Sequence, residues 1–354
     1  MPLPSSISIS SRAPRYLAIL AGVLAALLGL CAAFVYLVDP FQLFRPSRGT
    51  PNFYRVVEFQ IPGVARHYPH DAVVTGTSTS NNFRDGDLAA AFGWRATNFS
   101  IAGSMIGEQR AVLETALATG KTRFVFWGID PFAFRIVRGR PFPYYMYGGP
   151  GWRTAQYLLN LGALSHGVST MALPDAKRQS LAQWTERIAW DHQYTYGRAQ
   201  LLTAWEHRRS ASTAEFPEAP GALERSVEDM IATLVRAHPG VEFHIVLLPY
   251  SVLYSKLLVE QRQAEFEGGC RIGAAIASRI APLPNARVHD FRDDREITHN
   301  LDAFKDLLHF SGRVSRQIIA DVAADRRRLI PGAPDQACAR IREDATAFKV
   351  PSPR

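Results

Sequence analysis

A stretch of 23 residues without a single charge, Tyr16 to Val38, constrains this chain more than any other feature of its sequence. A run of that length can cross the roughly 30 Å hydrocarbon core of a bilayer as one helix. Arg12 and Arg15 precede it in a short tail that has no acidic residue, and positive charge favours the cytoplasmic side. We therefore predict a cytoplasmic tail (1–15), a transmembrane anchor (16–38) and a main domain outside the cytoplasm. Three basic residues after the anchor argue against this orientation: Arg45, Arg48 and Arg55.

The end of the apolar run distinguishes an anchor from a cleaved signal peptide. Residues 34–38 read Phe-Val-Tyr-Leu-Val and prolong the run beyond any small-residue cleavage site. A large leucine precedes Cys31, so this cysteine does not form a lipoprotein site. We predict an uncleaved signal-anchor.

Composition excludes several classes of protein. Hydrophobic content of 47% and charged content of 20% are ordinary for a folded domain. The net charge of +8 is spread along the chain, and its one basic cluster, Arg326 to Arg328, ends a predicted helix, where basic residues suit the helix dipole. No nucleic-acid motif accompanies it, so we predict no nucleic-acid partner. No metal-ligand spacing is present, and we predict no metal and no cofactor. Cys270 and Cys338 can pair in an oxidising compartment, but two isolated cysteines leave the pairing open.

Strand-like and helix-like segments alternate in two parts of the chain. Residues 72–75, 96–100 and 123–128 have strand patterns, separated by helical patterns at 87–92 and 107–119. This β-α-β-α-β order is typical of a parallel sheet with helices on both faces. The pattern resumes with strands at 241–248 and 286–291 and with helices at 221–237, 251–266, 271–281 and 312–328. We predict one α/β domain over residues 71–330.

The segments around this core have other textures. Residues 39–70 contain Pro40, Pro46, Pro51 and Pro62 among other residues, which predicts a juxtamembrane connector without a strand or long helix. Residues 131–210 predict an aromatic-rich helical insertion that forms part of the site's rim, although the same aromatics suit ordinary packing. Residues 331–354 predict a poorly ordered C-terminal tail.

The chemistry-bearing stretch is the turn after the first strand. Gly76 permits a sharp turn, and Thr77, Ser78, Thr79 and Ser80 follow at the carboxyl end of the strand, the edge where ligands bind in open α/β sheets. A serine on such a turn can lie beside backbone N–H groups that hold an oxyanion. The plainer interpretation is a polar turn in which Ser80 or Asn81 caps the next helix.

Two further strand ends raise the catalytic interpretation above the plain one. Gly103-Ser104 ends the second strand, and Asp306-Leu-Leu-His309 stands just before the last predicted helix. A serine hydroxyl is a weak nucleophile until a base removes its proton. A neutral imidazole can do so, and a carboxylate fixes its tautomer. We predict Ser78 as nucleophile, His309 as base and Asp306 as the carboxylate, while His309 and Asp306 could equally be surface residues of a turn.

The three blocks together resemble the SGNH, or GDSL-like, hydrolase superfamily. Gly76-Thr77-Ser78 is similar to the G-[ST]-S variants of its membrane-anchored bacterial members, and Asp306-x-x-His309 matches the D-x-x-H block. The resemblance implies a flavodoxin-like three-layer α/β/α fold and an oxyanion hole made by the Ser78 and Gly103 N–H groups. One block departs from the family, because Asp130 stands where an oxyanion-hole asparagine is expected, and an ionised carboxylate repels the developing charge. Candidate substitutes in an accessory site are Asn81, Asn82 and Asn98, and Asp130 itself could have another role.

The resemblance implies a single-pass protein of the bacterial inner membrane with a periplasmic domain. The expected activity is that of a serine esterase or O-acyltransferase acting on acyl groups of a cell-surface glycan, with no residue that separates water from a glycan acceptor. A slow or inactive relative is compatible with Asp130. The alternative function is a non-catalytic SGNH-like binding or scaffold protein of envelope polysaccharide assembly. A third is an envelope protein partner of a polysaccharide synthase.

Overall fold

A computed structural model describes residues 13–47, 49–137, 139–149, 151–174, 177–208, 215–217, 219–330 and 336–352. Its centre is a five-stranded sheet in the order β2-β1-β3-β4-β5, in which every pairing is parallel. The strands are β1 (Ala72–Thr75), β2 (Ala96–Asn98), β3 (Phe124–Ile129), β4 (Glu242–Leu247) and β5 (Ala286–Asp290). The predicted α/β class and parallel sheet are confirmed, and each strand lies within two residues of its predicted bounds.

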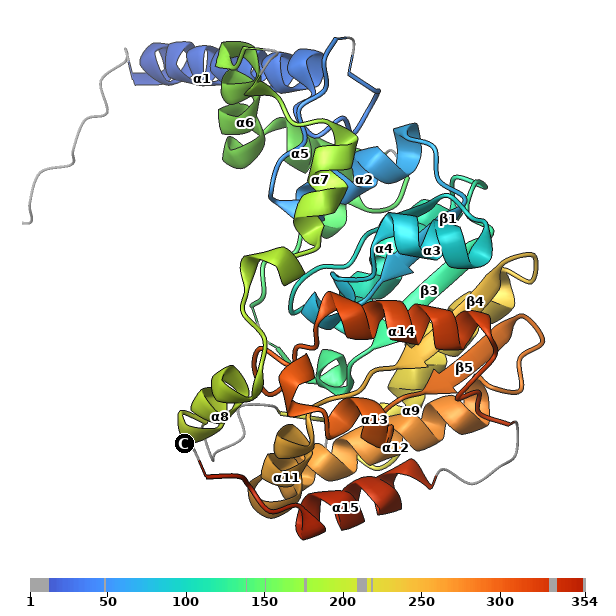
Figure 1. The fold of residues 1–354 in the computed structure, drawn as a ribbon. Helices are drawn as coiled ribbons and strands as arrows, with labels where there is room; N and C mark the ends of the chain where they lie inside the picture. The colour runs from blue at the N-terminus through green and yellow to red at the C-terminus, as the bar shows by residue number, and fades with distance from the viewer. Residues whose placement is uncertain are drawn as a thin grey trace, which may run out of the picture.

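Successive strand residues supply two separate hydrophobic clusters, because side chains alternate between the faces of a strand. Val73, Val125 and Ile245 belong to one cluster, and Val74 and Phe126 to the other. The first cluster includes buried residues of α2 (Val57–His67), α4 (Ile106–Leu117), α7 (Leu181–Ile188), α9 (Ala222–Val227), α10 (Thr233–Ala237) and α12 (Gln263–Arg279). The second includes residues of α3 (Asp85–Phe92), α8 (Arg198–Glu206), α11 (Val252–Gln261), α13 (Arg295–Thr298) and α14 (Gly312–Ala323). The clusters bury both faces of the sheet, and Figure 1 shows the helices around it.

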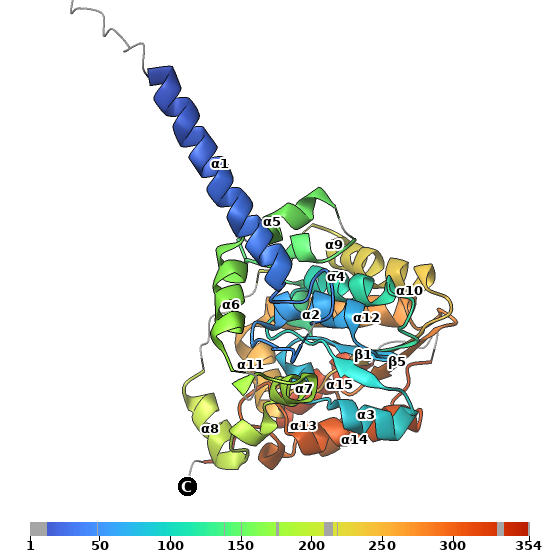
Figure 2. The same cartoon turned by 90° about the horizontal axis from the view of Figure 1, so that it is seen from above.

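The first helix, α1 (Ala13–Val38), extends away from the domain (Figures 1 and 2). Its stretch Pro14–Val38 is long and apolar enough to cross a membrane, by length and composition, and is the one such helix among the described residues. The predicted cytoplasmic tail, apart from its last residues, lies outside the described residues.

The flanking segments contain two helices that the sequence did not predict, and the second of them makes the prediction of a poorly ordered tail wrong. The connector at 39–70 contains α2, an eleven-residue helix whose Ile61, Val64 and Ala65 are buried in the first cluster. The expected tail contains α15 (Ala337–Ala347), which packs against α11. A disulfide joins Cys338 of this helix to Cys270 of α12, which settles the pairing that the sequence left open. The domain therefore extends beyond residues 71–330 at both ends.

The described residues of the segment 131–210 include four α-helices. These are α5 (Ala155–Leu158), α6 (Leu161–Ala172), α7 and α8. Two parts of this insertion contact different regions of the molecule. Helix α6 packs against α1. The Gly197 N–H, at the start of α8, donates a hydrogen bond to the Phe304 carbonyl, 3.1 Å away.

Candidate active site

The nucleophile turn follows β1 as a short 3-10 turn, Ser78–Ser80. Gly76 has φ of 151°, and a Cβ at this position would lie 2.1 Å from Ser80 Oγ and 2.8 Å from the Gly128 carbonyl oxygen. Only glycine therefore fits at the start of the turn. The plainer interpretation, in which Ser80 or Asn81 caps the next helix, is wrong, because α3 begins at Asp85 after Arg84.

The histidine lies on a tight loop between β5 and α14. Phe304 and Phe310 form an isolated antiparallel bridge at the two ends of the loop, and both rings are buried in the second cluster. Inside the loop, Asp306 Oδ1 accepts hydrogen bonds from the backbone N–H groups of Leu308 and His309, both at 2.9 Å. Apolar burial thus fixes the ends of the loop while the Asp306 carboxylate fixes its interior.

The structure brings Ser78, His309 and Asp306 into one hydrogen-bonded chain. Ser78 Oγ lies 2.8 Å from His309 Nε2, and His309 Nδ1 lies 2.9 Å from both carboxylate oxygens of Asp306. These distances suit proton transfer between a nucleophile and a base. The side chains of His309 and Asp306 are 18% and 33% exposed, so both are partly accessible to solvent.

Charge on this loop favours the ionised form of Asp306. Burial disfavours a carboxylate there, but hydrogen bonds from His309 and from Lys305 Nζ outweigh it and hold the pKa of Asp306 well below its usual range. An ionised Asp306 keeps the proton on His309 Nδ1, which leaves Nε2 free to accept from Ser78.

Asp130, the residue that departs from the family pattern, lies beneath the turn. It is fully buried, and its carboxylate accepts hydrogen bonds from Thr77 at 2.5 Å, Thr79 at 2.6 Å and Tyr250 at 2.7 Å. Burial raises the pKa of Asp130, against the effect of the three hydroxyls. Asp130 therefore holds both neighbours of Ser78 in place and does not face a substrate.

The asparagines that were candidates for the accessory site have different surroundings. Asn98 Nδ2 donates to the carbonyls of Ser80, at 2.9 Å, and Phe83, at 2.9 Å, and Asn98 Oδ1 accepts from Ser100 N. Its amide group is therefore engaged by the backbone of the turn. Asn82 Oδ1 accepts from the backbone N–H groups of Trp190 and Asp191. Asn81 makes no side-chain hydrogen bond to another described residue.

The backbone N–H groups of Gly103 and Ser78 are the predicted donors of an oxyanion hole. Gly103 adopts φ of 66° in the loop after β2, which lies beside the turn because Ser104 Oγ donates to the Gly76 carbonyl, 3.0 Å away. Neither the Gly103 nor the Ser78 N–H donates a hydrogen bond to any other described residue. Their role as a pair stays a prediction.

Sequence reasoning missed Lys305, and it considered Trp190 only as one of the aromatics of the predicted insertion. Trp190 Nε1 donates to the Ser78 carbonyl at 3.1 Å, and its ring meets the His309 ring edge-on with 5.2 Å between centroids. Lys305 Nζ lies over the rings of Trp190 and Tyr194, 4.9 and 4.4 Å from their centroids. Among the aromatics of the insertion, Trp190 and Tyr194 thus lie beside Lys305, whereas Trp184 is buried in the core.

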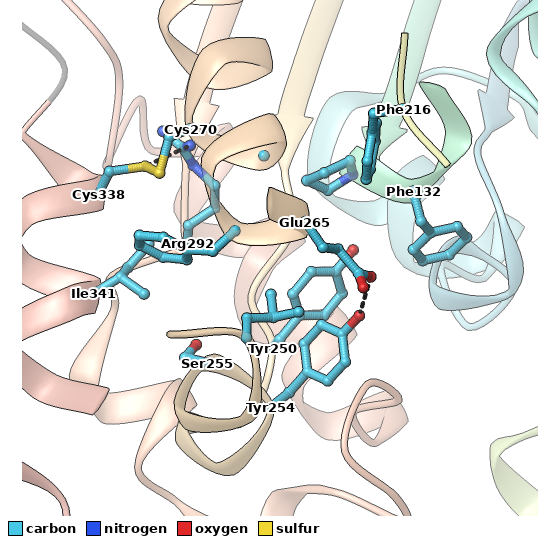
Figure 3. Close-up of a pocket in the computed structure, with 14 residues that line it drawn as sticks. Phe132, Phe216, Tyr250, Tyr254, Ser255, Glu265, Cys270, Arg292, Cys338 and Ile341 are labelled. Atoms are coloured by element: carbon cyan, nitrogen blue, oxygen red, sulfur yellow. Dashed lines mark hydrogen bonds between the residues drawn. A yellow bond between two sulfur atoms is a disulfide. The ribbon is translucent and has the colours of Figure 1, made fainter. Parts of the chain in front are cut away.

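A pocket adjoins the buried side of the site (Figure 3). Tyr250, which donates to Asp130, forms part of its wall together with Phe132, Phe216 and Tyr254. Its charged groups are paired, since Glu265 accepts from the Tyr254 hydroxyl and Arg292 binds both carboxylate oxygens of Asp290. Ser78 and His309 do not line this pocket.

Comparisons with known proteins found no match for this chain among protein-family models or among curated proteins.

Proposed function

We propose that this chain is a membrane-tethered, extracytoplasmic serine esterase or O-acyltransferase of the SGNH type, acting on acyl groups of a cell-surface glycan. The observation that carries the proposal is the unbroken chain of hydrogen bonds from Ser78 Oγ to His309, at 2.8 Å, and from His309 to Asp306, at 2.9 Å. A nucleophile, a base and an orienting carboxylate in this order are the functional unit of serine hydrolases.

The sheet topology supports the SGNH assignment and its three-layer α/β/α arrangement. The strand order 2-1-3-4-5 is that of flavodoxin-like folds. Apolar clusters bury both faces of the sheet, as a three-layer arrangement requires. Ser78 follows β1 at the carboxyl edge of the sheet, where ligands bind in such folds.

The proposed reaction has two halves. Ser78 Oγ attacks the ester carbonyl while His309 Nε2 takes the hydroxyl proton, and the N–H groups of Ser78 and Gly103 bind the oxyanion. His309 then gives its proton to the leaving alcohol, and the acyl group remains on Ser78. Water or a sugar hydroxyl attacks the acyl-enzyme, and its proton returns to Ser78 through His309. Asp306 stays ionised throughout.

Two features support an extracytoplasmic site at a bacterial inner membrane. Helix α1 is long and apolar enough to act as a single-pass anchor. The Cys270–Cys338 disulfide is typical of an oxidising compartment such as the periplasm.

Trp190 and Tyr194 beside His309 offer aromatic faces against which a sugar ring can stack.

One observation favours a second candidate, a non-catalytic scaffold of polysaccharide assembly. Asp130 occupies the position of the oxyanion asparagine and supplies no amide donor, and the loss of one such donor typically costs ~10²–10³ in rate. A scaffold predicts that His309→Ala preserves cellular function, whereas an enzyme predicts the phenotype of a deletion.

Hydrolysis of p-nitrophenyl acetate by the full chain in detergent tests the proposal. We expect turnover in the wild type, its loss in Ser78→Ala and its retention in the matched control Ser80→Ala, because Ser80 Oγ is buried. Release of acyl groups from an acetylated polysaccharide, or their transfer to a second glycan, then separates esterase from transferase. Equal turnover in wild type and Ser78→Ala would contradict both.

A further inference from the structure

The junction between α1 and the domain is held by an unusual number of polar contacts. The Asp39 carboxylate accepts hydrogen bonds from the N–H groups of Leu43 and Phe44, both at 2.9 Å, and from the Tyr157 hydroxyl of α5 at 3.0 Å. Arg45 donates to the Leu37 carbonyl at the end of α1, 2.8 Å away. The free carbonyls of a helix end are thereby satisfied by a cation, which also suits the helix dipole.

Apolar packing reinforces this junction. Val35 of α1 belongs to a buried cluster with Tyr157 of α5 and Ala163 of α6. The Phe34 ring lies so close to Gly167 of α6 that a Cβ there would come within 2.8 Å of it. Figure 2 shows α5 and α6 beside α1 where it leaves the domain. The anchor therefore has a fixed direction relative to these two helices.

The surface next to this junction is apolar and exposed. Leu161 and Met171 of α6 are 80% and 68% exposed, and Trp152, just before α5, is 78% exposed. We define the α5–α6 surface by these three residues together with Leu159 and Val168, which are also exposed. Trp152, Leu159 and Leu161 line one shallow hollow. Single exposed apolar residues are ordinary, but a group of five is a sign of an interaction surface.

Charge identifies the partner of this surface. Helix α6 has no charged residue, and residues 139–174 include no aspartate or glutamate, while Arg153 is exposed beside Trp152. Exposed Leu and Met with an adjacent Trp and Arg are typical of segments that lie in the interface of a bilayer. Such a composition also suits the negatively charged headgroups of anionic lipids.

We propose that the α5–α6 surface is a second membrane contact, seated in the interfacial layer of the leaflet from which α1 emerges. The proposal rests on the membrane anchor of the proposed function, because α1 brings this surface to the bilayer. Two contacts at different points fix the orientation of the domain, whereas a helix alone would leave it free to tilt. The partner is a lipid surface, and the insertion of α6 is shallow because another part of its surface, with Ala163 and Leu164, packs in the buried cluster with α1.

Nitroxide labels on single cysteines of the full chain test this contact. The Cys31→Ala background removes the one free cysteine of the described residues. Labels replace Leu161, Met171, Leu24 in α1, and Ile330, a 72% exposed residue remote from α1 in sequence that serves as the matched control. The labelled chains are placed in phosphatidylcholine–phosphatidylglycerol vesicles, and collisions with oxygen are compared with those of a water-soluble nickel chelate.

We expect the oxygen-to-nickel collision ratio at Leu161 and Met171 to lie several-fold above that at Ile330 and below that at Leu24. If the ratios at Leu161 and Met171 equal the ratio at Ile330 while the ratio at Leu24 is high, as in lipid, the second contact is overturned and the anchor stands. A water-like Leu24 would overturn the anchor and this contact together. The same labels in detergent-free vesicles of phosphatidylcholine alone report whether anionic lipid is required.

Discussion

The loop above Ser78, between Phe304 and Phe310, and the hydrogen-bond network beneath Ser78, around Asp130, each contain an aspartate. The two aspartates differ in the charge of the groups that donate hydrogen bonds to them. Asp306 receives hydrogen bonds from His309 and Lys305, two groups that carry or can carry positive charge. Asp130 receives its hydrogen bonds from three neutral hydroxyls in a fully buried site. The pKa of Asp306 is lowered, because its donors outweigh burial, and the pKa of Asp130 is raised by burial.

This difference in surroundings implies different roles for the two carboxylates. A carboxylate that supports an imidazolium must stay ionised and touch the imidazole, as Asp306 does. A buried carboxylate that binds only hydroxyls positions the groups that donate to it. Under the proposed function, the loop above Ser78 is therefore the reactive side of the site, and the network beneath Ser78 is the supporting side.

The largest expected effect comes from the reactive side itself. Ser78→Ala or His309→Ala should each lower kcat for p-nitrophenyl acetate by about 10³-fold or more, because nucleophile and base act as one unit. The double variant should be little slower than either single one. His192→Ala is the matched control. His192 is exposed, and its side-chain hydrogen bond among the described residues is with Gln193 and not with Ser78, His309 or Asp306. Additive losses would contradict a shared unit.

Replacement of the two aspartates by asparagine separates the two sides directly. Asp306→Asn should lower kcat by roughly 10³–10⁴, because the amide favours the wrong imidazole tautomer. Asp130→Asn should lower it by only about tenfold or less, as expected for a changed hydrogen bond behind the nucleophile.

The second variant also tests the family resemblance, since it restores the oxyanion-hole asparagine that the resemblance leads one to expect at position 130. A gain of activity in Asp130→Asn would show that this side chain reaches the oxyanion, against the buried position that the structure gives it. Steady-state kinetics of both variants in detergent provide the comparison.

Trp190→Phe should produce a smaller loss. The variant keeps an aromatic ring near His309 but removes the N–H that donates to the Ser78 carbonyl. One such hydrogen bond is worth roughly 0.5–1.5 kcal/mol, which corresponds to a loss of about 2- to 10-fold in kcat/KM. An unchanged rate would show that Trp190 does not position the nucleophile turn.

Lys305→Met should have a still smaller effect. The Lys305–Asp306 ion pair, at 2.7 Å, is partly exposed, and exposed pairs contribute about 0–1 kcal/mol. We expect a loss of less than about fivefold in kcat, with a weaker effect at high salt because salt screens such pairs. A loss as large as that of Asp306→Asn would give Lys305 a direct role in the reaction.

The two aspartates should also change stability with pH in opposite directions. The lowered pKa of Asp306 stabilises the fold above about pH 4, the unfolded value, and this stability is lost as pH falls towards the folded pKa. The raised pKa of Asp130 means that the folded chain retains a proton that the unfolded chain loses, so its contribution declines as pH rises above about 4.

Urea unfolding of the chain in detergent, followed by tryptophan fluorescence between pH 3 and 8, measures both contributions. The unfolding free energy of the wild type minus that of Asp306→Asn should rise with pH, and the same difference for Asp130→Asn should fall. Slopes of the same sign would remove the contrast between the two sides.

The sequence allowed prediction of the reactive side better than of the supporting side. Strand patterns placed Ser78 at the carboxyl edge of the sheet, and the Asp306-x-x-His309 block of the SGNH resemblance paired it with His309, although 231 residues separate the two. Tyr250 follows β4 at the same edge, so its position could have been noticed. Its partner was not predictable, because a strand pattern does not specify which side chains turn beneath a loop.

Other features needed tertiary information. Trp190 reaches Ser78 from an insertion whose irregular turns have no periodic pattern. The helix α15 follows Pro331 in a segment with no strong apolar pattern, and its place is fixed by the disulfide of Cys338 with Cys270. The packing of α6 on α1 depends on a close approach between Gly167 and Phe34. A single glycine in a sequence does not predict such an approach.

The most direct test of the account is covalent capture of the nucleophile. The full chain is treated with a fluorophosphonate, digested and mapped by mass spectrometry. We predict one phosphonyl adduct, on Ser78, which Ser78→Ala abolishes, His309→Ala slows severely and Ser80→Ala leaves in place. An intact chain without an adduct, an adduct on another serine, or equal labelling of the wild type and His309→Ala would contradict the claim that Ser78 and His309 form a catalytic pair.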